Sequence, residues 1–236
     1  MRKRLTVLTV LVIALLVLAL STGSFSLHGA ARSGNLAQVK RLVGWGFGVN
    51  KPSLLRRQTP LHLAAANGRA EVVRYLIEKG AGVNIRDEGG STALHHASFR
   101  GDVEVMKILL DNGASVSEAG TDCGPPLQWA AQQGHIEAAR ILLERGVDID
   151  QKGGDEYTAL GAAVSARQTK MVKFLLGEGA DVNHRAIYGA TPLHLAASNN
   201  DVEIARILVQ QGADPNLQCN GQPVPRQFVS SIHAQP

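Results

Sequence analysis

The stretch Thr59-Pro-Leu-His-Leu-Ala-Ala65 decides the fold, because altered copies of it recur along the chain at a constant step. The copies start at residues 59, 92, 125, 158 and 191, so each step is 33 residues. The four later copies read Thr92-Ala-Leu-His-His-Ala-Ser98, Pro125-Pro-Leu-Gln-Trp-Ala-Ala131, Thr158-Ala-Leu-Gly-Ala-Ala-Val164 and Thr191-Pro-Leu-His-Leu-Ala-Ala197. A period of this size is typical of a stacked array, in which each unit buries its apolar face against its neighbours.

Each repeat carries the start and stop signals of two short helices. Thr59 is suited to cap a helix, and Pro60 suits its first turn, where a missing N–H costs nothing. Gly68 then predicts a turn, and residues 71–77 have the apolar spacing of a second helix. A further glycine recurs in phase after each second helix, which predicts a backbone with positive φ. These glycines are Gly46, Gly80, Gly113, Gly146, Gly179 and Gly212.

This pattern resembles the ankyrin repeat, whose period is 33 and whose motif is T-P-L-H-x-A. The resemblance rests on the motif copies at 59–64, 92–97 and 191–196 and on a Gly-Ala-x-x-Asn pattern at 80–84, 179–183 and 212–216. It implies an all-α repeat solenoid of stacked helix-turn-helix units, each with a β-hairpin finger. We expect six repeats, at residues 26–58, 59–91, 92–124, 125–157, 158–190 and 191–223. Residues 224–236 form a partial C-terminal capping segment, in which Phe228, Val229 and Ile232 are expected to cover the last repeat.

Two repeats depart from the family pattern. Gln128 replaces the motif histidine in the fourth repeat, and Gly161 replaces it in the fifth. Arg167 also replaces the glycine between the helices of the fifth repeat, and arginine tolerates a left-handed backbone less well than the Asn200 of the sixth. The fifth repeat is therefore predicted to be the weakest.

The N-terminal segment 1–25 has the order of a secretory signal. Arg2-Lys3-Arg4 precedes an apolar run from Leu5 to Leu20, and small polar residues follow. As a helix, this run measures about 24 Å, short of the roughly 30 Å hydrocarbon core, but its extension to Ser24 just spans it. Two alternatives thus stay open: a cleaved signal peptide that engages the export machinery, or an anchor of residues 5–24 in the inner membrane. Both place the repeats in a periplasmic or other extracytoplasmic compartment, and we expect a bacterial source.

Charge and cysteine content limit the partners and cross-links. Without the N-terminal cations, 21 Lys and Arg face 20 Asp and Glu, so the body is nearly neutral and does not favour nucleic acid. Cys123 and Cys219 lie nearly three repeats apart, roughly 24–30 Å in a stack, beyond the reach of a disulfide. We predict two free thiols.

The recurring histidines are interpreted as framework. His62, His95 and His194 share one phase of the motif, and buried polar groups that recur need hydrogen-bond partners. His95 and His96 point about 100° apart on a helix, so they do not share a metal ion. The sequence contains no catalytic, metal-binding or phosphate-binding motif, so we expect no catalytic activity, cofactor or metal.

The resemblance implies that the binding residues lie at finger tips and on the concave face of the first helices. By phase, these positions include Asn67, Arg86, Phe99, Arg100, Gln132, Gln133, Tyr157, Arg185 and Tyr188. Interfaces favour aromatic and arginine anchors, which singles out Phe99 and Tyr188. Trp129 takes the place of Leu63 and is predicted to lie in the core.

The leading functional hypothesis is a monomeric, non-catalytic protein-protein interaction module outside the cytoplasmic membrane. Two alternatives stay open: an inhibitor or immunity protein for a secreted toxin or enzyme, and a membrane-tethered structural scaffold. The sequence does not identify the protein partner.

Overall fold

The computed structural model describes residues 26–118, 124–154 and 156–233. The expected signal or anchor at 1–25 and the thiol of Cys123 lie outside these residues, and the thiol of Cys219 is free. Within the described ranges, no helix is long and apolar enough to cross a bilayer.

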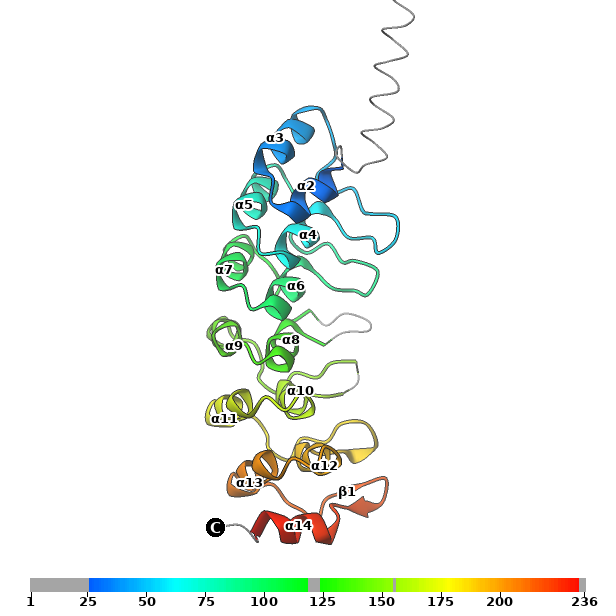
Figure 1. Cartoon of the computed structure of the whole chain (residues 1–236), viewed down its shortest axis with the longest axis vertical. Helices are drawn as coiled ribbons and strands as arrows, with labels where there is room; N and C mark the ends of the chain where they lie inside the picture. The colour runs from blue at the N-terminus through cyan, green and yellow to red at the C-terminus, as the bar shows by residue number, and fades with distance from the viewer. Residues whose placement is uncertain (1–25, 119–123, 155, 234–236) are drawn as a thin grey trace, which may run out of the picture.

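The helices stack in pairs into one column, with α2 at one end and α14 at the other (Figure 1). The first helices of the pairs are α2 (Leu27–Ser33), α4 (Pro60–Ala66), α6 (Ala93–Arg100), α8 (Pro126–Gln133), α10 (Ala159–Ser165) and α12 (Pro192–Ser198). The second helices are α3 (Leu36–Gly44), α5 (Ala70–Glu78), α7 (Val103–Asp111), α9 (Ile136–Glu144), α11 (Thr169–Gly177) and α13 (Val202–Gln210). Each helix contacts its counterpart in the next pair, which confirms the predicted helical solenoid.

The fingers project from the side of the first helices, away from the second helices (Figure 1). Strands occur in the described residues at the last finger, where β1 (Gln218–Cys219) pairs antiparallel with β2 (Gln222–Pro223). The described residues of other fingers form backbone hydrogen bonds, such as Asp87 N to Ser91 O at 2.9 Å and Gly90 N to Asp87 O at 3.1 Å. The finger between α11 and α12 contains a short 3-10 turn, η1 (Ile187–Gly189).

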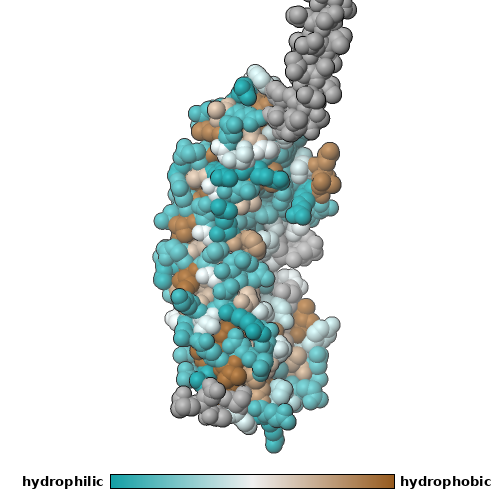
Figure 2. All heavy atoms as spheres, in the orientation of Figure 1, coloured by the Kyte–Doolittle hydropathy of each residue, from teal (hydrophilic) through white to brown (hydrophobic). Residues whose placement is uncertain are grey.

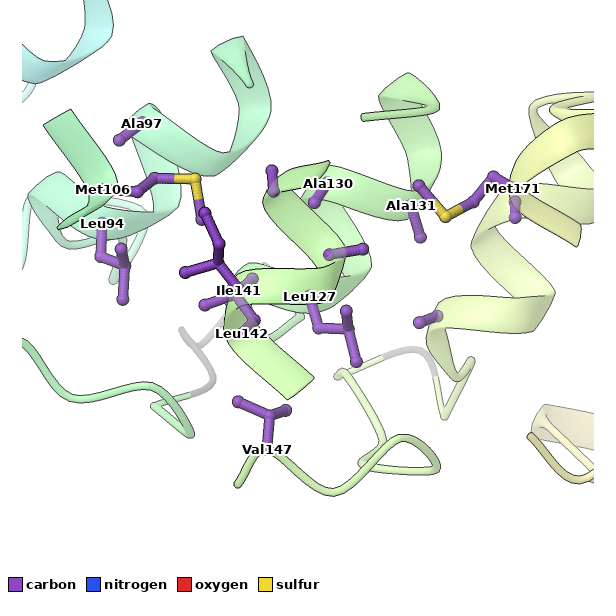
Figure 3. Packing of buried hydrophobic residues seen from close by; sticks show 14 of the residues in the cluster. Leu94, Ala97, Met106, Leu127, Ala130, Ala131, Ile141, Leu142, Val147 and Met171 are labelled. Carbon is purple, nitrogen blue, oxygen red and sulfur yellow. The ribbon is translucent and has the colours of Figure 1, made fainter. Parts of the chain in front are cut away.

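The core is a thin layer between neighbouring pairs, built from small and branched aliphatic side chains. Figure 3 shows Met106, Leu127, Ala130 and Leu142 among the buried side chains that lie between the helices of successive pairs. Alanines on the first helices let the pairs approach closely, and leucines and methionines fill the space that remains. The core is therefore well packed although the chain contains few aromatic residues.

The predicted left-handed turns are present. The glycines that end the second helices have φ between 82° and 94°, namely Gly46, Gly80, Gly113, Gly146, Gly179 and Gly212. Arg167 and Asn200 occupy the turn between helices with φ of 56° and 52°. A side chain is strained in this region, and arginine more so than asparagine, because a short amide forms local hydrogen bonds there.

The motif histidines cap their own helices. The Thr59 N–H donates to His62 Nδ1 at 3.1 Å, and the corresponding bonds join Thr92 to His95 at 3.0 Å and Thr191 to His194 at 3.3 Å. Because Nδ1 of His62 accepts, its Nε2 carries the proton and donates to Ser91 O at 3.1 Å. Burial lowers the pKa of His62 and of His95 to about 4, so both are neutral caps. The framework interpretation is confirmed for these histidines.

The C-terminal residues form α14 (Arg226–His233), which packs on α13. Phe228 and Ile232 are buried, and Val229 is half-buried against the core. These side chains cover apolar surface at the end of the stack, where no further pair follows in the described residues.

Candidate protein-binding surface

The fifth residue of each motif forms a stripe along the first helices. These residues are Leu63, His96, Trp129, Ala162 and Leu195. Their neighbours in the next helical turn end the helices and include Phe99. Since the backbone frame is constant, the differences along this face lie in its side chains.

An aromatic cluster lies in the middle of this face. Phe99 on α6 and Trp129 on α8 meet edge to face, with ring centroids 5.4 Å apart and planes at 72°. The His96 ring lies 6.2 Å from Trp129, and the His62 ring lies 5.7 Å from His96. The cluster therefore spans three consecutive first helices.

The prediction that Trp129 lies in the core was wrong. Its side chain is half-buried, because the indole reaches from α8 to the rings of Phe99 and His96 on α6, which are themselves exposed and half-buried. Phe99, which was selected from the sequence, is 45% exposed beside it. The signal that could have found Trp129 is its size, since the equivalent positions carry leucine, histidine or alanine.

A buried carboxylate joins the fingers to this face. Asp87 Oδ2 accepts a hydrogen bond from His96 Nε2 at 2.9 Å and another from Gln58 Nε2 at 3.3 Å. Burial by itself raises the pKa of Asp87, but the bonds from His96 and from the Ser91 N–H outweigh it and lower the pKa to about 2. Asp87 is thus ionised and holds two successive fingers against α6.

The structure brings five of the predicted site residues to the ends of neighbouring first helices. They are Asn67, Phe99, Arg100, Gln132 and Gln133. Asn67 is partly used by the fold, because its amide donates to Leu63 O at 2.8 Å. Phe99, Arg100 and Gln132 are exposed, while Gln133 is half-buried. This group is continuous with the aromatic cluster.

The other four predicted residues lie on separate fingers. Arg86 bonds to Glu118 at 3.0 Å across adjacent fingers, and Arg185 donates to Gln218 O at 3.0 Å. Tyr188 is 76% exposed and has a left-handed φ of 62°. Tyr157 is half-buried and lies over Gly161, where an added Cβ would meet its ring at 3.1 Å. Tyr157 therefore occupies the room that is left where Gly161 replaces the motif histidine. The structure does not join these four residues into one patch.

The side chains on this face offer apolar contacts and hydrogen bonds. Among the described residues, no group of three His, Cys, Asp or Glu side chains could hold a metal ion. His96 is bonded to Asp87, and His62 and His95 cap helices. The face combines aromatic rings with amide and guanidinium groups, which is the composition of a protein-binding hot spot.

Comparison with known families assigns the chain. The family model described as "Ankyrin repeats (3 copies)" matches residues 27–120 and 127–219, and "Ankyrin repeats (many copies)" matches residues 101–143. These matches cover most of the sequence, and the chain belongs to the ankyrin repeat family.

Solved structures of this family resemble the whole stack. The human ASB11 ankyrin repeat domain matches with a TM-score of 0.79 and 31% identity, covering 89% of this chain and 99% of that domain. The ankyrin repeat domain of Bcl-3, a member of the IkappaB protein family, matches with a TM-score of 0.74 and 32% identity, covering 88% of this chain and 97% of that domain.

Curated relatives match over shorter segments. The E3 ubiquitin-protein ligase XBAT32 of Arabidopsis thaliana is 38% identical over 68 residues, which is 28% of this chain and 13% of the relative. Protein phosphatase 1 regulatory subunit 27 of Homo sapiens is 42% identical over 60 residues, which is 25% of this chain and 38% of the relative. Because so little of each relative is matched, the activities in their names do not carry over to this chain.

Proposed function

We propose that this chain is a non-catalytic protein-interaction module that binds a partner protein through the first-helix face centred on Phe99 and Trp129. The observation that carries the proposal is the edge-to-face contact of these two rings at 5.4 Å, on a face where Phe99 is 45% exposed. An exposed phenylalanine packed against a half-buried tryptophan on rigid helices is the kind of anchor on which binding energy concentrates.

The polar residues around the pair support the same assignment. Arg100 and Gln132 are exposed at the ends of α6 and α8, next to Phe99 in the sequence or in the stack. Arginine is enriched at interfaces, and amides supply adaptable hydrogen bonds at the rim. The partner that fits is a protein segment with an apolar centre and carbonyl or carboxylate groups at its edge.

We also infer that the module acts outside the cytoplasmic membrane of a bacterium, either released or tethered. This inference rests on the order Arg2-Lys3-Arg4, apolar run and small polar residues at the N-terminus. N-terminal sequencing of the protein from membrane and soluble fractions tests it. A new N-terminus near Ser21–Ser24 indicates release, the original N-terminus in the membrane fraction indicates an anchor, and the original N-terminus in the soluble fraction contradicts the proposal.

A site-specific crosslinking experiment tests the binding face. Phe99 is replaced by a photoreactive phenylalanine in cells, and Lys107, exposed on α7 on the second-helix side, is replaced in a matched control. We expect light to produce a discrete adduct from position 99 and none from position 107. The same adducts from both positions, or none from position 99, contradict binding at this face.

A further inference from the structure

Large apolar side chains are exposed on the first finger and on the turn that leads into it. Leu54 and Leu55 are 102% and 88% exposed, and Trp45 and Phe47 are 59% and 40% exposed. Figure 2 shows hydrophobic side chains projecting from the finger region near the α2 end of the column, at the upper right. The two leucines add nothing to the core, and Phe47 lines the same hollow as both of them. Exposed apolar side chains that lie together mark an interaction surface.

The same finger borders a hollow of about 680 Å³. Phe47, Leu54 and Leu55 contribute its apolar lining, and Lys51 and Arg56 bring positive charge to it. The first finger is therefore amphipathic, because its apolar side chains lie next to cationic ones.

The whole first helix pair with its finger is uniformly cationic. Residues 26–58 contain no Asp or Glu, whereas residues 59–236 contain 15 Lys and Arg against 20 Asp and Glu. The cations are all exposed, and among the described residues none of them lies within ion-pair distance of a carboxylate. They are Arg32, Lys40, Arg41, Lys51, Arg56 and Arg57. One end of the array is thus positive and the remainder is net negative.

The position of this pair in the chain places it next to the apolar N-terminal run. That run ends at Leu20 and α2 begins at Leu27, so six residues connect them. Six extended residues reach at most about 20 Å. A bilayer that holds residues 5–20 therefore keeps the first helix pair close to its surface.

We propose that the first helix pair and its finger form a docking surface for an anionic lipid bilayer. Leu54 and Leu55 enter the boundary between head groups and acyl chains, with Trp45 and Phe47 at the level of the head groups. Lys51, Arg56 and the neighbouring cations bind lipid phosphates. This division of apolar and cationic groups is that of proteins that lie on membranes. The docking does not rest on the proposed protein partner, but the closeness of this surface to the bilayer rests on the proposed retention of residues 5–20 in the membrane.

Fluorescence quenching by brominated lipids tests the docking. The chain has two tryptophans, so Trp45→Phe with Trp129→Phe removes the background, and Leu54→Trp then places a reporter at the fully exposed finger tip. A matched control carries Tyr188→Trp, an exposed finger position far along the stack. The full-length proteins are reconstituted into vesicles with bromine on the acyl chains, with or without anionic lipid, and circular dichroism verifies folding.

We expect quenching and a blue shift of the reporter at position 54 in anionic vesicles, reversed by salt, and neither effect at position 188. Each Lys or Arg at an anionic surface changes affinity on the order of five-fold, so Lys51→Glu with Arg56→Glu should lower the salt concentration that releases the reporter. The proposal is overturned by equal quenching in neutral and anionic vesicles, by equal quenching at positions 54 and 188, by insensitivity to the charge reversals, or by no quenching at position 54.

Discussion

The imidazole of His96 lies 2.9 Å from the carboxylate of Asp87, and this contact joins α6 to the finger that precedes it. The other carboxylate oxygen of Asp87 accepts the N–H groups of Gly89 and Ser91 at 3.1 and 3.0 Å. One side chain thus closes its finger, fixes the finger to the helix and, through Gln58, contacts the previous finger. His96 also lies beside Trp129, so the finger network continues into the aromatic cluster.

Replacing Asp87 should therefore destabilise the array. The Asp87→Ala variant leaves the Ser91 N–H and His96 without their acceptor, and we expect a loss on the order of 2–4 kcal/mol in the free energy of unfolding. Urea denaturation measures this change. Glu88→Ala is the matched control, because Glu88 is exposed on the same finger and its removal should change the free energy by at most about 0.5 kcal/mol. Equal effects of the two substitutions would contradict this role for Asp87.

Stability should fall as the pH is lowered from about 6.5 to 4. The pKa of His62 and of His95 is lowered from 6.5 to about 4 by burial. In this window the unfolded chain binds protons on these imidazoles and the folded chain does not, so acid favours unfolding. The cost is on the order of 2–3 kcal/mol for each imidazole at pH 4 relative to pH 7.5.

Urea denaturation at a series of pH values measures this dependence. The ionised Asp87 near both rings acts in a separate window, because its pKa of about 2 makes its contribution disappear only below about 4. The control is His62→Gln, since Gln128 occupies the same motif position in the fourth repeat. The substitution should reduce the difference in the free energy of unfolding between pH 7.5 and pH 4.5, even if it lowers the stability at both pH values. An undiminished change would assign the pH dependence to other groups.

The fifth repeat should open more readily than the second. Arg167 has a φ of 56° at the turn between α10 and α11, where other pairs place glycine or asparagine. Native-state hydrogen exchange should show lower protection across 160–176 than across 61–77. Arg167→Gly should raise that protection, because glycine removes a strain of roughly 1 kcal/mol.

Asn200→Gly is the control for this experiment. Asn200 has a φ of 52° in the equivalent turn, and asparagine already tolerates this conformation. Little change in protection is expected. Equal protection of the two segments in the unaltered protein would refute the assignment of the weak repeat.

The Phe99–Trp129 contact should be measurable as a coupling. Aromatic pairs in this geometry contribute about 0.5–1.5 kcal/mol beyond the area that they bury. A double-mutant cycle of Phe99→Ala and Trp129→Ala in urea denaturation should give a coupling energy in this range. Phe99→Leu and Trp129→Leu form a second cycle that keeps apolar volume. A coupling energy near zero in the first cycle would show that the two rings do not stabilise each other.

Much of the fold could be predicted from the sequence because its signals are local. Two of these signals depend on contacts within one helical turn. One is the glycine with positive φ, and the other is the histidine that caps its own helix three residues after a threonine. Their recurrence every 33 residues then requires stacking, since one thin unit has no core of its own. The structural roles of Gly80, Arg167 and His62 could be predicted from their places within the 33-residue repeat.

The exposed surfaces from which binding is proposed depend on contacts between repeats, and these contacts cannot be read from the 33-residue spacing. Trp129 occupies a position where Leu63 is buried, yet its indole is half-buried and meets the exposed Phe99 ring of α6 edge to face. Tyr157 covers Gly161 because a missing side chain leaves room beside it. Leu54 and Leu55 are as apolar as any core residue and are exposed because nothing in the described structure packs against that finger tip.

The sequence by itself determined the repeat, its turns and its helix caps, because each depends on residues close together along the chain. Only the tertiary structure decided which large side chains reach solvent, because burial depends on the volume that neighbouring repeats leave free. Phe99 and Trp129 became one surface, and the first finger a second, only when the stack was formed.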